Sequence, residues 1–563
     1  MKCSNCGAEW NEGEKFCAVC GQPVNAEQSG NTVKPVNTGQ TGSVTQPAAG
    51  QSVGQMTGSG QDSGKKKGFF SNKIVIALVV VCILAVGVAA AAVFKKSNMS
   101  DAEYYQQIEI KNRDEQAEKL GGYFDRVYGS FAKESVNKKI NMKLTLSDSV
   151  KSLATLYGVN LSKLDNIEMD VAVKKEKNVY SSIIKAGGNG EGLVTLKSHY
   201  DLDTKDSYVQ IPELSESYLH TSMEDLEANE LYSFAGFGKV IPASEDLKKI
   251  YTRYTDLVIK NAKNVKKAEE KVECAAEGVS CKADLYTVTM KGEEAVSLAG
   301  DFLKQLKGDS EIKGIIENID EEASKEYEEE IAETIEELEE GVDATDFSMV
   351  MEVQVGSDDK IIGRKITLKE DDEEVVIRMA DPGDGENFGL EAVIESQGKE
   401  IFHLHGKGTE NDGIINGDFS LDAAIPSNDD TLELTKNVLK VTVEDYDVSN
   451  LKDGEVSGAI TYSTEARAEL ANYSLRVEAE GNQEEATGVV TVLAGQETVA
   501  AIDVKMESGA EVESAMPSES DKVYETSDSD AMSAYQSEWD VLQLLQKVQD
   551  TLGIDFSSLI QLF

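Results

Sequence analysis

Apolar and polar residues alternate along much of the chain after residue 130. This spacing is typical of strands that bury one face. It is clear at Ile140–Leu146, Ile167–Val173 and Phe347–Val355. Turn-forming clusters such as Glu-Asn-Asp-Gly at 410–413 separate the strands, so we expect a large antiparallel sheet. Further strands are predicted at Gly192–Lys197, Ser207–Ile211, Lys282–Met290, Ile361–Lys369, Glu374–Met379, Leu390–Glu395, Glu400–Gly406, Gly417–Leu421, Asn437–Glu444, Glu455–Ser463, Tyr473–Glu480, Thr487–Leu493 and Thr498–Met506.

A helical spacing of apolar residues interrupts this alternation. It is present at Ala102–Phe131, and again between about 244 and 340, where Glu293–Leu306 and Tyr327–Leu338 are predicted helices. Ser244 is a predicted N-cap, because acidic residues follow it at the positive end of the helix dipole. The sequence therefore predicts an α+β region in which a helical insert divides the strands.

One segment is apolar throughout. Ile74–Phe94 contains no charged residue and would span about 31 Å as a helix, close to the ~30 Å hydrocarbon core of a bilayer. Four lysines precede it within ten residues, and only Lys95 and Lys96 follow. This pattern predicts a transmembrane helix with a cytoplasmic N-terminus and an extracytoplasmic C-terminal domain in the cell membrane.

The chain has a net charge of −47, and the residues from Ser97 onward carry −51 because those before them carry +4. Such a charge repels polyanions, so we expect no nucleic acid to bind the predicted exported domain. Residues 25–64, in contrast, are rich in Gly, Ser, Thr, Gln and Asn and cannot form a core. They predict a flexible linker.

Four of the seven cysteines form two CxxCG knuckles near the N-terminus. Four thiolates are the tetrahedral set that Zn²⁺ prefers, and a segment this short has no core of its own. The spacing predicts one structural Zn²⁺ ion rather than a redox pair, because a redox CxxC belongs to a βαβ context. The predicted ligands are Cys3, Cys6, Cys17 and Cys20.

This N-terminal part resembles the zinc-ribbon, single-pass membrane proteins of Gram-positive bacteria, including the teicoplanin-resistance-associated type. In those proteins a ribbon, a polar linker, a membrane helix and a variable exported domain follow one another. The resemblance covers about residues 1–96. It implies zinc at the four cysteines and no particular function for the exported part.

The predicted fold class is accordingly multidomain, with an N-terminal zinc ribbon, one transmembrane helix, and a large α+β exported region dominated by antiparallel β-sheet with a helical insert. The predicted parts are a zinc ribbon at 1–24, a polar linker with a basic end at 25–73, a transmembrane helix at 74–94, an exported α+β region at 97–345, a β-rich region at 346–507, an acidic linker at 508–530 and an amphipathic C-terminal helix at 531–563.

Three weaker patterns lie in the large domain. Cys274 and Cys281 flank a short loop, and we predict a disulfide between them, with two separate buried thiols as the alternative. His403 and His405 share a strand face and could bind metal, but no third ligand can be named, so two surface histidines are the favoured interpretation. A solvated turn is likewise favoured over a Ca²⁺ site at Asp381, Asp384 and Glu386.

No HExxH motif and no phosphate-binding loop is present in the sequence. The leading hypothesis is a membrane-anchored, envelope-facing binding or sensing protein without catalytic activity, whose exported domain binds a protein or another envelope partner. Two alternatives are an exported carrier of lipid or lipoprotein and an exported enzyme that acts on the cell wall. An apolar cavity would favour the carrier, and a cleft with clustered carboxylates would favour the enzyme.

Overall fold

The computed structural model describes residues 99–132, 135–157, 160–222, 242–319, 321–339, 347–370, 373–426, 432–449 and 455–553. All of them belong to one compact unit of the chain, which spans Lys66–Phe563. The predicted zinc ribbon at 1–24 and the predicted transmembrane helix at 74–94 lie outside the described residues.

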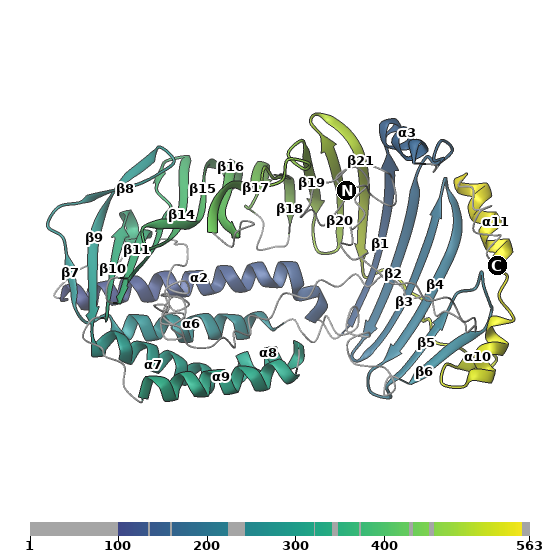
Figure 1. The fold of residues 1–563 in the computed structure, drawn as a ribbon, viewed down its shortest axis with the longest axis horizontal. Helices are drawn as coiled ribbons and strands as arrows, with labels where there is room; N and C mark the ends of the chain where they lie inside the picture. Colours follow the sequence, from purple (N-terminus) through teal and green to yellow (C-terminus); the bar gives the residue numbers. More distant parts are fainter. Residues whose placement is uncertain are drawn as a thin grey trace, which may run out of the picture. The chain divides into compact units, whose positions relative to one another are not determined.

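The described strands belong to one 22-stranded sheet that is almost entirely antiparallel (Figure 1). Its longest run pairs strands in chain order. That run consists of β9 (Val279–Lys291), β10 (Phe347–Val355), β11 (Ile361–Glu370), β12 (Glu373–Ala380), β14 (Asn387–Ser396), β15 (Lys399–Asn411), β16 (Ile414–Pro426), β17 (Leu432–Asp447), β18 (Val456–Ser463), β19 (Tyr473–Gly481), β20 (Glu485–Ala494) and β21 (Glu497–Ser508).

The last strand of this run pairs with the first strand of the chain. β21 lies antiparallel to β1, with Leu144 opposite Ile502. The sheet then continues in chain order to β6 and ends at β22, and β6–β22 is the one parallel pair among the described strands. These strands are β1 (Ser135–Leu146), β2 (Ile167–Glu176), β3 (Val179–Gly188), β4 (Glu191–Asp201), β5 (Asp206–Gln210), β6 (Tyr218–Ser222) and β22 (Val523–Glu525).

At the other end of the sheet, helices cover one face of β9–β12. The core there holds Tyr105, Phe302, Met351 and Ile366, each at most 1% exposed. The helices with residues in this core are α2 (Asp101–Ala132), α6 (Ser244–Asn261), α7 (Glu293–Lys307) and α9 (Glu321–Glu339), with α8 (Ser310–Ile319) packed beside it. Ser244 is the first residue of α6 and not its cap, because Ala243 holds the N-cap position without a side-chain hydrogen bond.

Three short strands complete the sheet near β9. β7 (Val265–Lys267) pairs with β9, and β8 (Val272–Ala276) forms a hairpin with the start of β9. The two turn residues, Glu277 and Gly278, both have positive φ, as a type I′ hairpin turn requires. β13 (Gly383–Asp384) pairs with β14.

The predicted fold class is therefore wrong as a description of this structure. The structure shows one large sheet-dominated domain with eight helices among the described residues, and no zinc ribbon or membrane helix among them. The sheet crosses the position at 345/346 where two regions were predicted, because β9 pairs with β10. Alternation reveals strands but not their partners, so the pairing of β1 with β21 could not be predicted.

The predicted single-pass topology and cell-membrane localisation also need correction. In the part of the chain that the structure describes, no helix combines the length and apolar character needed to cross a bilayer. α2 is the longest described helix, and it carries charged residues throughout. The prediction rested on Ile74–Phe94 alone, and the structure gives it no support.

The C-terminal segment attaches to the edge of the sheet through His220. This histidine on β6 contacts Glu525 of β22 through Nδ1 at 2.7 Å and Asp206 of β5 through Nε2 at 2.9 Å. Burial of the ring lowers the pKa of His220, but the two carboxylates outweigh this effect and the net shift is upward. The protonated ring therefore holds β22 against β5 and β6.

This contact predicts a pH-dependent contribution to stability. Because the pKa of His220 is raised in the folded state, its contribution is complete below the unfolded value of about 6.5 and is lost as the pH rises through the folded value. We expect His220→Asn to lower the free energy of unfolding by up to about 1 kcal/mol at pH 5.5, and much less at pH 9. Urea titrations of both proteins at the two pH values measure this, and an equal difference at both would contradict it.

Candidate metal centre

Two histidines lie side by side on β15. His403 and His405 alternate with Phe402 and Leu404, so the strand sends both rings to one face of the sheet and the apolar side chains to the other. The ring centroids are 4.5 Å apart. Phe402 pairs with Ile394, which packs against the helix-covered core, so Phe402 lies on the helix side of the sheet. His403, its neighbour in sequence, therefore lies on the opposite side, and so does His405.

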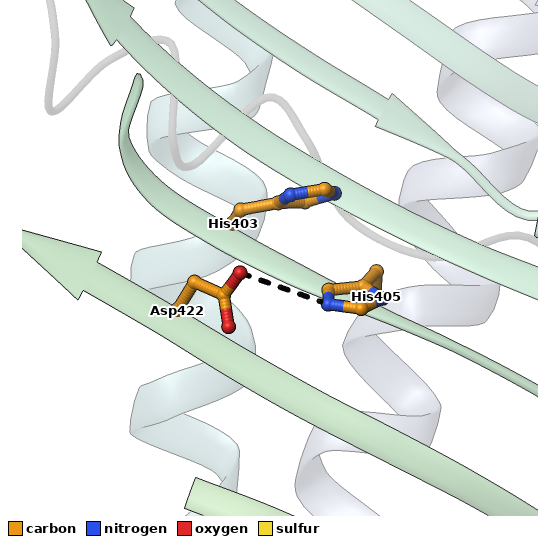
Figure 2. Close-up of side chains that lie close together, drawn as sticks. All are labelled: His403, His405 and Asp422. Atoms are coloured by element: carbon orange, nitrogen blue, oxygen red, sulfur yellow. Dashed lines mark ion pairs between the residues drawn. The ribbon is translucent and has the colours of Figure 1, made fainter. Parts of the chain in front are cut away.

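Asp422 on β16 completes a three-residue cluster (Figure 2). It pairs directly with His403 in the β15–β16 register. One donor atom from each of His403, His405 and Asp422 lies within 4.8 Å of the other two. Asp422 is only 6% exposed, so its carboxylate lies within the protein surface and not above it.

A backbone contact fixes the orientation of the Asp422 carboxylate. The N–H of Asn437 on β17 donates to Asp422 Oδ1 at 2.7 Å. This N–H is available because the register between β16 and β17 shifts between Leu421 and Ala423, which leaves Asp422 opposite a bulge. The second oxygen, Oδ2, lies 3.9 Å from His405 Nε2 and faces the cluster.

A second carboxylate orients His405. Glu277, at the tip of the β8–β9 hairpin, lies with Oε1 3.1 Å from His405 Nδ1. If Nδ1 carries the proton and donates to Glu277, the lone pair of Nε2 points toward Asp422. A carboxylate behind the imidazole is the usual arrangement for a histidine that binds a metal, because it fixes the tautomer and makes the ligand more basic.

One ring nitrogen of His403 makes no hydrogen bond within the described part of the chain. Its Nε2 atom is buried and makes no hydrogen bond to any described residue. The Oε1 atom of Glu391 lies 3.5 Å away, which is beyond the usual range for an N–H···O bond. An unsatisfied buried nitrogen costs about 1–3 kcal/mol, and a metal ion bound there would remove this cost.

The donor set fits a zinc-class ion. Two imidazole nitrogens and one carboxylate oxygen are borderline ligands, which suit Zn²⁺ and its neighbours better than Mg²⁺ or Ca²⁺. Metal–ligand bonds of about 2.0–2.2 Å would place the donor atoms roughly 3.3 Å apart. The cluster, within 4.8 Å, would need only small side-chain rotations to reach this spacing. A water molecule would take the fourth position, because Glu277 lies behind the His405 ring at Nδ1.

The other predicted sites have different outcomes. Cys3, Cys6, Cys17 and Cys20 lie outside the described residues, so zinc at these positions stays a prediction. Asp381 is paired with Lys360 Nζ at 3.6 Å, and burial raises its pKa to about 6. Asp384 and Glu386 are exposed at the β13–β14 turn. Among the described residues, these three do not form a group with converging ligand atoms.

Cys274 and Cys281 lie directly opposite each other in the β8–β9 hairpin. Directly paired strand residues lie about 4.5–5.5 Å apart at Cα, within the range of disulfides. Both thiols are free in the structure, and burial raises the pKa of Cys274 to about 12. The disulfide between them stays a prediction that the hairpin register allows.

A groove of about 1100 Å³ lies on the polar face of β17–β21, β1 and β2. Its charged side chains include Glu444, Glu478 and Asp503, and Arg476 bridges the first two of these. Among the described residues that line this groove there is neither a histidine nor a cysteine. The groove therefore offers no imidazole or thiol for acid–base or nucleophilic catalysis.

No protein-family model matches the chain, and no curated protein matches it significantly.

The sequence interpretation missed Asp422 and Glu277. Asp422 could have been found from the turn at 410–413. If Asp412 and Gly413 are the two turn residues of a hairpin, the residues on either side of the turn pair in order, and this register places His403 opposite Asp422. Both turn residues do have positive φ in the structure. No such signal exists for Glu277, because its contact with His405 joins residues 128 positions apart.

Proposed function

We propose that this protein binds a divalent metal ion of the zinc class at His403, His405 and Asp422, and that it acts as a binding protein rather than an enzyme. The observation that carries the proposal is the convergence of three ligand atoms within 4.8 Å, with Asp422 held by the Asn437 N–H and His405 by Glu277. Orientation of ligands by neighbouring groups is typical of sites that bind metal.

The surroundings of the cluster favour a cation. Glu391 and Glu400 lie 3.5 and 3.8 Å from the two ring nitrogens of His403, and Glu277 lies beside His405. These carboxylates add to the field of a chain whose net charge is −47. A bound ion would link β15 and β16, and through Glu277 and His405 it would also reinforce the contact with the β8–β9 hairpin.

Zinc binding by the full-length protein tests the proposal. We expect isothermal titration to show one site fewer in the variant His403→Ala/His405→Ala than in the wild type, since two of the three ligands are lost. Asp422→Ala should weaken the same site at least tenfold, and Glu277→Gln should weaken it by about 10–100-fold, the usual effect of losing an orienting group. The predicted cysteine site is present in every variant, so any zinc bound there contributes equally to each titration and does not affect the difference between the proteins.

Ser420→Ala is the matched control. Ser420 lies opposite His405 and two residues from Asp422 on the same face, but it is not part of the cluster. This variant should bind zinc as the wild type does. Ca²⁺ should give no comparable signal at the histidines. Equal zinc stoichiometry and affinity in the wild type and in the double-histidine variant would show that the cluster is not a metal site.

A further inference from the structure

The face of the sheet that the helices cover at β9–β12 continues along the sheet as an apolar face, which has no helix layer among the described residues. Hydrogen-bonded register places apolar residues in rows across neighbouring strands, with Gly488 between Ala479 and Val504 in one of them. One row runs from β17 to β2 through Val443, Ile460, Val477, Val490, Ile502, Leu144 and Ile167. Three parallel rows contain Val441, Tyr462, Leu475, Val492, Ala500 and Leu146; Ala479, Val504, Met142 and Met169; and Ala486, Met506, Ile140 and Val171. We call these four rows the open apolar face.

Exposure separates the open apolar face from the covered part. Under the helices, Met351, Ile366 and Val375 are at most 1% exposed. On the open apolar face, Leu475 is 39% exposed and Ile167 is 37% exposed. Met169 is 36% exposed, and the other side chains of this face are half-buried. Contiguous exposed apolar surface of this kind marks an interaction site in a folded protein.

Charge is excluded from these rows. None of the residues that make up the open apolar face is acidic, in a chain that has 102 acidic residues. The acidic side chains of the same strands point to the opposite face, where Glu444, Glu478 and Asp503 belong to one row. Two copies that met through their open apolar faces would therefore keep these carboxylates on the outside, which limits the repulsion between them.

We infer that the open apolar face binds the same face of a second copy of this chain. The face contributes about 20 apolar side chains, and a stable interface needs about 20–30 residues per partner. Two sheets can pack through such faces about 10 Å apart, with strands nearly aligned. An isologous contact of this kind closes as a dimer, because the same patch is used by both copies. A small apolar ligand fits less well, since such ligands are held in pockets that bury most of their surface.

Sedimentation of the full-length protein tests this inference. We expect the wild type to sediment as a dimer at micromolar concentration and Val490→Glu to sediment as a monomer, because the carboxylate would be buried at the centre of the contact. Thr491→Glu is the matched control: it adds the same charge one residue away, on the opposite face beside Arg476, and should remain dimeric. Circular dichroism of each variant shows whether it is folded.

Leu475→Lys provides a second variant if Val490→Glu does not fold. Leu475 is already 39% exposed, so a lysine is tolerated there in the monomer but disfavours the dimer. A monomeric wild type would overturn the inference, even if its open apolar face bound an apolar dye. A dimer that persists in both folded variants would also overturn it, since the two copies would then associate through another surface. One such surface is Ile74–Phe94, which every variant retains. The metal site lies on the opposite face, so this result is independent of zinc binding.

Discussion

Replacing Glu109 by leucine is expected to lower the free energy of unfolding by about 3–5 kcal/mol. The Glu109 carboxylate on α2 accepts two hydrogen bonds from Arg364 of β11, at 2.7 and 2.9 Å. The Arg364 side chain is only 3% exposed. Without Glu109, a guanidinium would remain buried between helix and sheet with no carboxylate to neutralise it.

The double variant Glu109→Leu/Arg364→Met separates the cost of an unpaired charge from the value of the pair. Removing both charges leaves two apolar side chains of similar volume, and such replacements are often neutral or stabilising. The buried Tyr105 hydroxyl loses its acceptor Glu109 in the single and the double variant alike, so its cost cancels in the comparison. We therefore expect the double variant to be more stable than Glu109→Leu alone. Urea titrations of the three proteins measure the differences. Equal losses in the single and double variants would show that packing, and not the unpaired charge, causes the effect.

Lys304 and Glu339 form a matched exposed pair. They join α7 to α9 at 3.0 Å, but their side chains are 56% and 60% exposed. Lys304→Met should cost less than about 1 kcal/mol, because solvent screens the pair and both side chains lose entropy when they meet. We therefore expect the buried pair Glu109–Arg364 to contribute more to the free energy of unfolding than the exposed pair Lys304–Glu339.

The sequence predicted local structure far better than long-range pairing. Phe347–Val355 was predicted as a strand and is confirmed as β10 with the same bounds, since its alternation directly reflects a one-sided environment. Alternation says nothing about partners beyond a tight turn. The contact between Glu109 and Arg364 joins residues 255 positions apart, and no periodicity in either segment indicates it.

The candidate metal site shows the same limit at a finer scale. His403 and His405 could be recognised because two residues at i and i+2 on a strand share a face. Asp422 was recoverable from the hairpin turn, since a two-residue loop fixes the register between its strands. The bulge that frees the Asn437 N–H, and the hairpin that brings Glu277 to His405, depend on tertiary packing. The residues that orient the ligands were therefore beyond prediction from the sequence.

The second large effect is expected at Asp309, which joins three elements at the start of α8. Its side chain has no exposed surface, and its Oδ2 atom accepts hydrogen bonds from Arg253 and from the Tyr254 hydroxyl, the latter at 2.8 Å. Its Oδ1 atom accepts the N–H of Ile312 at 3.1 Å, which caps the first turn of α8. One carboxylate therefore satisfies a buried hydroxyl, a guanidinium and a free helix N–H.

We expect Asp309→Ala to lower the free energy of unfolding by about 2–4 kcal/mol, since it removes a helix cap and leaves the buried Tyr254 hydroxyl without an acceptor, while Arg253 keeps Glu311 at 3.1 Å. Asp309→Asn keeps the volume and an acceptor for the cap, so it should lose less. Tyr254→Phe should cost about 1 kcal/mol alone, and almost nothing in the Asp309→Ala background, because the hydroxyl then has no carboxylate to donate to. Urea titrations of the four-protein cycle measure this coupling, and hydrogen exchange at α8 locates the loss. Two results would show that Asp309 does not hold α6 and α8 together. One is a loss of unfolding free energy for Asp309→Ala no larger than that for Tyr254→Phe. The other is a loss for Tyr254→Phe that is the same with and without Asp309.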